Sequence, residues 1–245
     1  MAVPVVEGTV GQKDVPIYLD GLGTVQAFNT VTVRVRVDGQ LQKLNFVEGQ
    51  DVHAGQVLAQ IDPDPYRTQV EQDEAKKKED EAQLANAQLQ LTRDTQLLAQ
   101  QIVAQQDYDA QKALVDQLVA TVQADQAAID NARVQLNYTT VVSPIDGRTG
   151  ILQVDVGNIV HASDSNGIVV ITQLRPISVV FTLPEQTFSE IEQQRSRGEL
   201  AVVAVGRDNR TVLDRGKLAV IDNQIDTTTG TIRLKANFPN AQLHL

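Results

Sequence analysis

The longest pattern of hydrophobic and polar positions along the sequence predicts two long helices. Positions 66–143 contain neither Gly nor Pro, and most residues in this run are strong helix formers. In its second half, apolar residues recur at alternating spacings of three and four, the pattern of a helix that packs along one seam. The positions of this stripe are Val115, Leu118, Val122, Asp125, Ile129, Ala132 and Leu136. A weaker stripe in the first half is formed by Leu84, Ala87, Leu91, Asp94 and Leu98.

Shorter alternating patterns before and after this run predict β-strands. Before the run, VTVRVRVDGQ at 31–40 alternates Val with polar residues, and VLAQI at 57–61 has the length of a short strand. At and after its end, VVSPIDGRTGILQVDVGNIV at 141–160 again indicates short strands with turns at Asp-Gly and Gly157. Both ends of the helical run therefore return to the same β structure, so the run must reverse direction. We expect an antiparallel coiled-coil hairpin over 66–138 with a turn near 99–106. At roughly 35 residues per helix it would be about 50 Å long. Asp64 is the expected N-cap, followed by Pro65 in the first turn.

A sequence repeat flanks the hairpin. The segment GQDVHAG at 49–55 returns as GNIVHAS at 157–163, and Asp-Gly pairs precede both copies, always 108 positions apart. Such a repeat, split by a long insert, predicts a two-fold module in which two four-stranded halves pack as a flattened sandwich. The predicted turn residues are Asp38, Gly39, Gly49 and Gly55 in the first half, and Asp146, Gly147 and Gly157 in the second.

The two ends of the sequence read mostly as strands. Residues 12–30 predict strand, Gly-rich turn and strand. Residues 174–245 predict five strands with the sequences PISVVFTL, LAVVAV, TVLD, GKLAVID and TIRLKANF. One helix is expected between Pro184 and Gly198.

Composition narrows the possible functions. A net charge of −10 argues against nucleic acid as a partner, because phosphate binding needs a basic surface. The absence of Cys excludes disulfides and thiolate chemistry, and no run approaches the roughly 20 apolar residues of a membrane helix. The Gly-x-Gly at 21–23 lacks the third Gly and the helix of a nucleotide-binding loop, and no acid pair has a catalytic pattern. We therefore expect no enzymatic activity and no cofactor.

Two of the three histidines occupy equivalent places in the repeat. His53 and His161 could lie near the two-fold axis, which makes a shared metal site a hypothesis. No acidic or His cluster accompanies them in the sequence, so the simpler interpretation is two histidines in turns.

The repeat and its insert resemble a known family. Each half resembles a lipoyl or biotinyl half motif, and the helical hairpin stands where carrier domains keep a modified Lys. A lipoyl-like domain split by a long α-hairpin resembles the periplasmic adaptor proteins, or membrane fusion proteins, of RND-type tripartite efflux pumps in the HlyD superfamily. The segment VDGQLQKLNFVEGQDVHAGQVLAQIDPDPY and the later GKLAVIDNQIDTTTGTIRLKANFPN carry this resemblance.

The resemblance implies an elongated, multi-domain protein that mixes β and α structure. Its lipoyl-like β-sandwich would comprise 31–65 and 139–171, split by the antiparallel α-helical hairpin at 66–138. A small β-barrel would comprise 12–30 and 172–245, and would be incomplete because the family places a further strand after FPN. Residues 1–11 would be a remnant of a membrane-proximal strand.

The resemblance also implies partners. The family docks its hairpin tip on a TolC-type outer-membrane channel through Arg, Leu and Ser at fixed spacing. Arg93 and Leu97 match that pattern, whereas Ala104 stands at the Ser position, and Ile102 and Val103 add apolar residues between them. The other partner would be an inner-membrane RND transporter, and the protein would form a homo-oligomer, a hexamer in the assembled pump. The location would be the periplasm of a Gram-negative bacterium, with membrane association through the pump or an N-terminal anchor.

Two alternatives remain open. The lipoyl-like repeat split by a helical hairpin also fits an adaptor of an ABC-type or type I secretion system. A biotin or lipoyl carrier would need a Lys in the turn between the halves, but the nearest, at 76–78, lie within the expected helix.

Overall fold

The computed structural model describes residues 10, 12, 17–208 and 210–245. The expected membrane-proximal strand at 1–11 lies outside these residues, apart from Val10, as does most of the first strand expected in 12–30. The protein divides into two compact units, one formed by Asn29–Gln173 and the other by Met1–Phe28 with Leu174–Leu245.

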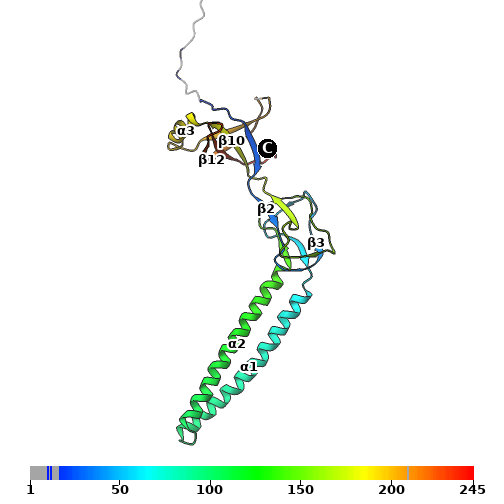
Figure 1. Cartoon of the computed structure of the whole chain (residues 1–245), viewed down its shortest axis with the longest axis vertical. Coiled ribbons are helices and arrows are strands. Elements are labelled where there is room, and N and C mark those ends of the chain that lie inside the picture. The colour runs from blue at the N-terminus through cyan, green and yellow to red at the C-terminus, as the bar shows by residue number, and fades with distance from the viewer. Residues whose placement is uncertain (1–9, 11, 13–16, 209) are drawn as a thin grey trace, which may run out of the picture. The chain divides into compact units, whose positions relative to one another are not determined.

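The first unit contains a sandwich of two four-stranded sheets and a helical hairpin (Figure 1). One sheet has the order β2 (Thr30–Val33), β9 (Val169–Thr172), β7 (Gly147–Thr149) and β4 (Asp51–Val52). The other has the order β6 (Thr140–Val142), β5 (Val57–Ile61), β3 (Gly39–Leu44) and β8 (Ile159–Val160). The expectation that each half of the repeat forms its own four-stranded layer is therefore wrong, because each sheet takes two strands from each half.

The 108-position offset explains this exchange of strands. It relates β3 to β7 and β4 to β8, and each member of a pair lies in a different sheet. The first half pairs with the second through β3 and β8, with Gly39 opposite Val160, and through β4 and β7, with Val52 opposite Gly147. These two pairings are equivalent under the repeat, so the pseudo-two-fold operation exchanges the two sheets.

The sandwich core is aliphatic. Val33, Val35 and Val37 are buried while Arg34 and Arg36 between them are exposed, as the alternating pattern predicts. Leu41, Leu58, Ile61, Ile168, Val169 and Ile171 complete the centre, and each is at most 1 % exposed. These residues belong to one cluster of buried hydrophobic side chains in the sandwich.

The hairpin consists of α1 (Asp64–Ala99) and α2 (Gln105–Tyr138). The predicted α-helical hairpin within a β-sandwich is thus confirmed. The predicted Asp64 cap is wrong: Pro63 occupies the N-cap position, without a side-chain cap bond. Instead, the carboxylate of Asp62 accepts the backbone N–H of Asp64 at 3.2 Å. An acceptor just before the helix therefore replaces the expected cap.

The second unit is built on one five-stranded antiparallel sheet. Its order is β1 (Gly23–Ala27), β10 (Ile177–Pro184), β13 (Thr231–Phe238), β12 (Val212–Asp226) and β11 (Ala201–Val205). The two strands expected at TVLD and GKLAVID are a single strand, because β12 runs through Gly216 without a break. A Cβ there would lie 2.3 Å from the carbonyl oxygen of Asn237, so only Gly lets β12 stay close to β13.

A short 3-10 turn, η1 (Glu185–Thr187), leads into α3 (Phe188–Arg195), which confirms the expected helix in this region. Ile191 of α3 packs with Leu183, Ile232 and Leu234 of the sheet. Within the described residues, no helix has both the length and the apolar character needed to cross a membrane.

Candidate functional site

The two copies of the repeat hold each other in place. Asp38 Oδ1 accepts the backbone N–H of Ala162 at 2.7 Å, and Asp146 Oδ1 accepts the backbone N–H of Ala54 at 3.0 Å. Each aspartate therefore caps the turn of the opposite half. We call these two contacts the Asp clamps.

The glycines of the repeat serve the same reciprocal geometry. Gly49 donates its N–H to Thr149 and Gly157 donates to Leu41, at φ values of +75° and +95° that favour glycine. Gly55 has a φ of +82°. A Cβ on Gly39 would approach Ile61 at 2.7 Å, and one on Gly147 would lie 2.6 Å from a backbone oxygen. All seven predicted turn residues lie where the halves cross or in the neighbouring turns.

The hydrogen bonds of the Asp clamps also lower the pKa values of both aspartates. The N–H of Ala162 lowers the pKa of Asp38, with a smaller contribution from His161. The N–H of Ala54 lowers the pKa of Asp146, followed by a hydrogen bond with His53.

Each histidine of the repeat therefore lies beside an aspartate of the other half. His53 Nδ1 is 3.3 Å from Asp146, and His161 Nδ1 is 3.6 Å from Asp38. Among the residues that the structure describes, no group of three or more His, Asp or Glu side chains is placed to hold a metal ion.

The base of the hairpin is tied to the sandwich by two tyrosines. The hydroxyl of Tyr66 in the first turn of α1 donates to the carbonyl of Asp38 at 2.8 Å. At the end of α2, the ring of Tyr138 lies 5.0 Å from the guanidinium of Arg36. Because Asp38 also forms a clamp, the hairpin base and the crossing of the halves share a residue.

Polar contacts cross the seam of the hairpin near its base. Lys76 on α1 forms ion pairs with Asp125 of α2 and, at 3.2 Å, with Asp80 of its own helix. Asp125 is 6 % exposed, and one of its oxygens has no hydrogen-bond partner among the described residues. Arg133 pairs with Glu74 at 2.6 Å. We call the Lys76–Asp80–Asp125 group the polar layer.

The tip is a tight reversal between Ala99 and Gln105, within the turn expected near 99–106. The N–H of Ile102 donates to Leu97 at 3.0 Å and the N–H of Gln101 donates to Leu98 at 2.9 Å. These two bonds form a Schellman motif, which usually places Gly in the left-handed position. Here Gln101 occupies it with a φ of +58°. The sequence predicts the turn near 99–106, but Gln does not signal a left-handed conformation, so the residue that adopts it could not be predicted.

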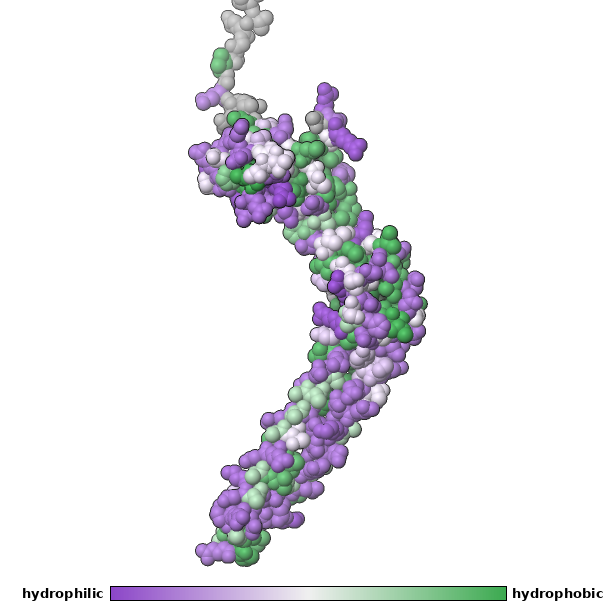
Figure 2. All heavy atoms as spheres, in the orientation of Figure 1, coloured by the Kyte–Doolittle hydropathy of each residue, from purple (hydrophilic) through white to green (hydrophobic). Residues whose placement is uncertain are grey.

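The tip presents apolar side chains and a bare helix terminus. Ile102 is 66 % exposed, whereas Leu97 and Val103 are half-buried. Figure 2 shows a hydrophobic patch at this end of a largely hydrophilic hairpin. Ala104 is the N-cap of α2 and makes no side-chain cap bond. Arg93 is exposed on α1, which ends at Ala99.

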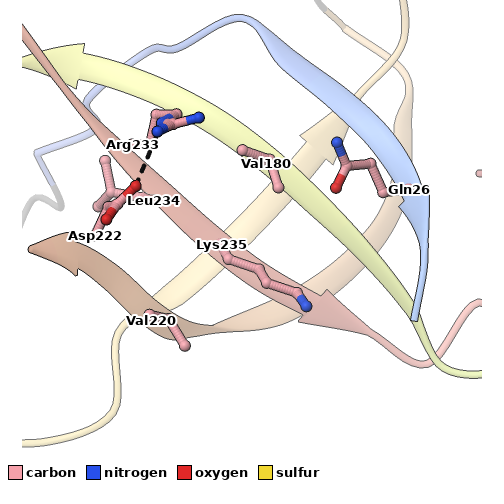
Figure 3. A pocket seen from close by; sticks show the side chains of 7 residues that line it. All are labelled: Gln26, Val180, Val220, Asp222, Arg233, Leu234 and Lys235. Atoms are coloured by element: carbon pink, nitrogen blue, oxygen red, sulfur yellow. Dashed lines mark ion pairs between the residues drawn. The ribbon is translucent and has the colours of Figure 1, made fainter. Parts of the chain in front are cut away.

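The second unit has a shallow hollow of about 310 Å³ on its sheet (Figure 3). Lys235 lies opposite a valine on each neighbouring strand, and Arg233 pairs with Asp222 at 3.3 Å. The lining contains no nucleophile paired with a base, so it offers no catalytic arrangement. It consists of Gln26, Val180, Val220, Asp222, Arg233, Leu234 and Lys235.

Known families and proteins match both units. Residues 29–172 match the barrel-sandwich hybrid domain of RND MFPs, and residues 176–245 match the beta-barrel domain of the same proteins. The multidrug resistance protein MdtA of Pantoea ananatis is 49 % identical over 97 % of this chain and 58 % of its own length. MdtA of Escherichia coli O45:K1 is 48 % identical over 97 % of this chain and 57 % of its own length. The protein thus spans somewhat more than half the length of these relatives.

Solved structures agree with this match. A putative efflux transporter from Bacteroides eggerthii superposes with a TM-score of 0.59 at 26 % identity, covering 89 % of this chain and 61 % of its own. A MacA-MexA chimeric protein with the Pseudomonas aeruginosa MexA α-hairpin gives a TM-score of 0.51 at 28 % identity, covering 88 % of this chain and 72 % of its own. With both of its units matched in sequence and its hairpin architecture shared with solved relatives, the chain belongs to the family of RND membrane fusion proteins.

Proposed function

We propose that this chain is part of a non-enzymatic periplasmic adaptor that links an inner-membrane RND transporter to a TolC-type outer-membrane channel. The observation that carries this proposal is the hairpin. It places an exposed apolar tip, formed around Ile102, at the far end of two helices of 36 and 34 residues. An apolar patch on a hydrophilic element favours burial against a partner.

The tip offers groups that suit such a partner. Arg93 supplies a guanidinium for carboxylates or carbonyl oxygens. Leu97, Ile102 and Val103 supply apolar surface, and the uncapped start of α2 at Ala104 leaves backbone N–H groups available to an acceptor. In this proposal the channel provides the acceptor that Ala104 lacks.

The adaptor would act by assembly. Six copies would form a ring in which the hairpins line a tube, and the second unit, with the parts of the protein beyond this chain, would contact the transporter. The drug-resistance names of the relatives support multidrug efflux as the process. Membrane association would come through the pump or through an anchor outside the chain. The lipoyl-like domain would comprise 31–65 with 139–171, and the β-barrel domain would comprise 12–30 with 172–245.

A cell-based assay tests the tip. In the full-length protein, Arg93→Glu with Leu97→Asp should abolish drug resistance, because it replaces a cation and an apolar contact with two carboxylates. The matched control is Lys78→Glu with Leu89→Asp, which makes the same changes at exposed positions farther down α1. Circular dichroism should show that both variants remain folded. Wild-type resistance in the tip variant would contradict the assignment.

A further inference from the structure

The loop between β8 and β9 contains the single Asn-Gly pair of the sequence, Asn166-Gly167. Asn166 is exposed to solvent, whereas Gly167 is buried and adopts a φ of +71°. Asn-Gly is the dipeptide in which a backbone nitrogen most readily reaches the preceding side-chain amide, because Gly has no side chain to obstruct the approach. Neither the family nor the proposed function assigns a role to this pair.

The nucleophile and the electrophile of that reaction are both available here. Within the described residues, the N–H of Gly167 donates to no backbone acceptor, while the next N–H, that of Ile168, donates to Val33 at 2.8 Å. The hydroxyl of Ser165 donates to the side-chain oxygen of Asn166 at 3.4 Å. That contact draws electron density from the amide carbon, which makes it more open to attack.

The side-chain stem of an arginine lies beside this dipeptide. A Cβ placed on Gly167 would be 3.2 Å from Cγ of Arg34, so the stem of that arginine packs directly against the glycine. Arg34 is exposed, and its guanidinium forms no ion pair with a described residue. Because the exposed Arg34 side chain extends from this contact, its guanidinium can turn toward the loop, where a positive charge would favour loss of the Gly167 amide proton and stabilise the oxyanion formed by attack.

We propose that Asn166 is a site of spontaneous deamidation, and that the carboxylate it forms pairs with Arg34. The nitrogen of Gly167 attacks Cγ of Asn166, a new bond forms between these two atoms, and the bond from Cγ to the amide nitrogen Nδ2 breaks. Ammonia leaves with the proton from Gly167, which gives a cyclic succinimide. Water then adds to one of the two ring carbonyls and opens the ring to aspartate or isoaspartate.

The modification would tie two parts of the sandwich together. The loop at 161–167 carries the Asp38 clamp through Ala162, and Arg34 lies in the segment that follows β2. An ion pair between the new carboxylate at position 166 and Arg34 would add a link between them. The isoaspartate product would instead lengthen the backbone next to Gly167, where the backbone oxygen of Val33 would lie 2.5 Å from an added Cβ. Because extra backbone atoms would clash there, isoaspartate should disrupt the packing of the loop against β2.

Peptide mapping of the folded protein tests the proposal. After incubation at neutral and at mildly alkaline pH, mass spectrometry should find an OH in place of the NH2 group at Asn166, more rapidly at the higher pH. Labelling by an isoaspartyl methyltransferase should appear in the same peptide. The exposed Asn158, which precedes the β-branched Ile159, is the internal control, and Asn166 should convert at least tenfold faster.

Variants of Asn166 and Arg34 distinguish deamidation at Asn166 from modification at other residues. Asn166→Gln should abolish the signal, and Arg34→Gln should slow conversion severalfold while leaving the folded state intact. Asn166→Asp, which copies the aspartate product, should melt at a higher temperature than Asn166→Asp combined with Arg34→Gln. Equal conversion rates at Asn166 and Asn158, or a rate unaffected by Arg34→Gln, would overturn the proposal.

Discussion

At the scale of single residues, two aspartates and two alanine N–H groups connect the halves of the sandwich. Asp38 and Asp146 are exposed, yet each takes a backbone hydrogen bond from the opposite half. The sequence showed that these residues are equivalent, because the offset between them is the offset of the whole repeat. It could not show that each serves the other half, since local turn signals carry no information about which strands will pair.

Replacing both clamps should lower stability in a pH-dependent way. Both pKa values are lowered from 3.8, so the ionised carboxylates stabilise the fold above that pH, and this contribution is lost as the pH falls through the folded-state values. Asp38→Asn with Asp146→Asn should therefore reduce the Tm at neutral pH, and the Tm difference from wild type should shrink in acid. Thermal melts from neutral pH to below 3.8 measure this. Asp116→Asn, at an exposed position on α2, is the control, and a difference that grew in acid would contradict the prediction.

Gln101 gives a second residue-scale prediction. Its left-handed conformation costs a non-glycine residue about 1 kcal/mol, so Gln101→Gly should stabilise the hairpin by about that amount. Gln100→Gly should bring no such gain, because Gln100 has a negative φ. Denaturant unfolding of the two variants compares them. Equal effects on the free energy of unfolding would show that the left-handed position is not strained.

At the scale of elements, the helices were more predictable than the strands. A run without Gly or Pro, together with a stripe of seven spaced positions, is sufficient to predict a pair of long helices. Val115, Ile129 and Ala132 of that stripe are buried, as predicted. The short strands β4 and β8 have two residues each. Their positions depend on pairing with distant strands, which periodicity cannot reveal.

The polar layer is one of two exceptions to apolar packing among the stripe positions, the other being the buried Asp94 of α1. Asp125 follows the stripe by its position, but its burial is tolerated because Lys76 neutralises it. Lys76→Met alone should lower the Tm, because it leaves a buried carboxylate without its cation. Lys76→Met with Asp125→Leu should melt at or above the wild-type temperature, since apolar packing then continues through the layer. Differential scanning calorimetry of the two variants and the wild type checks this order, and a double variant less stable than Lys76→Met would contradict it.

At the scale of the whole molecule, the repeat and its insert were sufficient to predict the fold class. A pattern split by 108 positions requires two halves that meet, and the hairpin between them follows from the composition of the insert. The tip was only partly predictable. Arg93, Leu97 and Ala104 were identified by family resemblance, whereas the turn at Gln101 follows from backbone geometry that its side chain does not signal.

The central proposal is that the protein containing this chain joins an RND transporter to an outer-membrane channel, which it contacts through its hairpin tip. The most direct test is photo-crosslinking in cells, with a crosslinking residue at Ile102 of the full-length protein and a control at Leu89, followed by mass spectrometry of the captured partners. We predict that Ile102 captures an outer-membrane channel, that Leu89 does not, and that an RND transporter co-purifies with the complex. Co-purification of an ABC ATPase in place of the RND transporter, or absence of the channel at Ile102, would contradict the account.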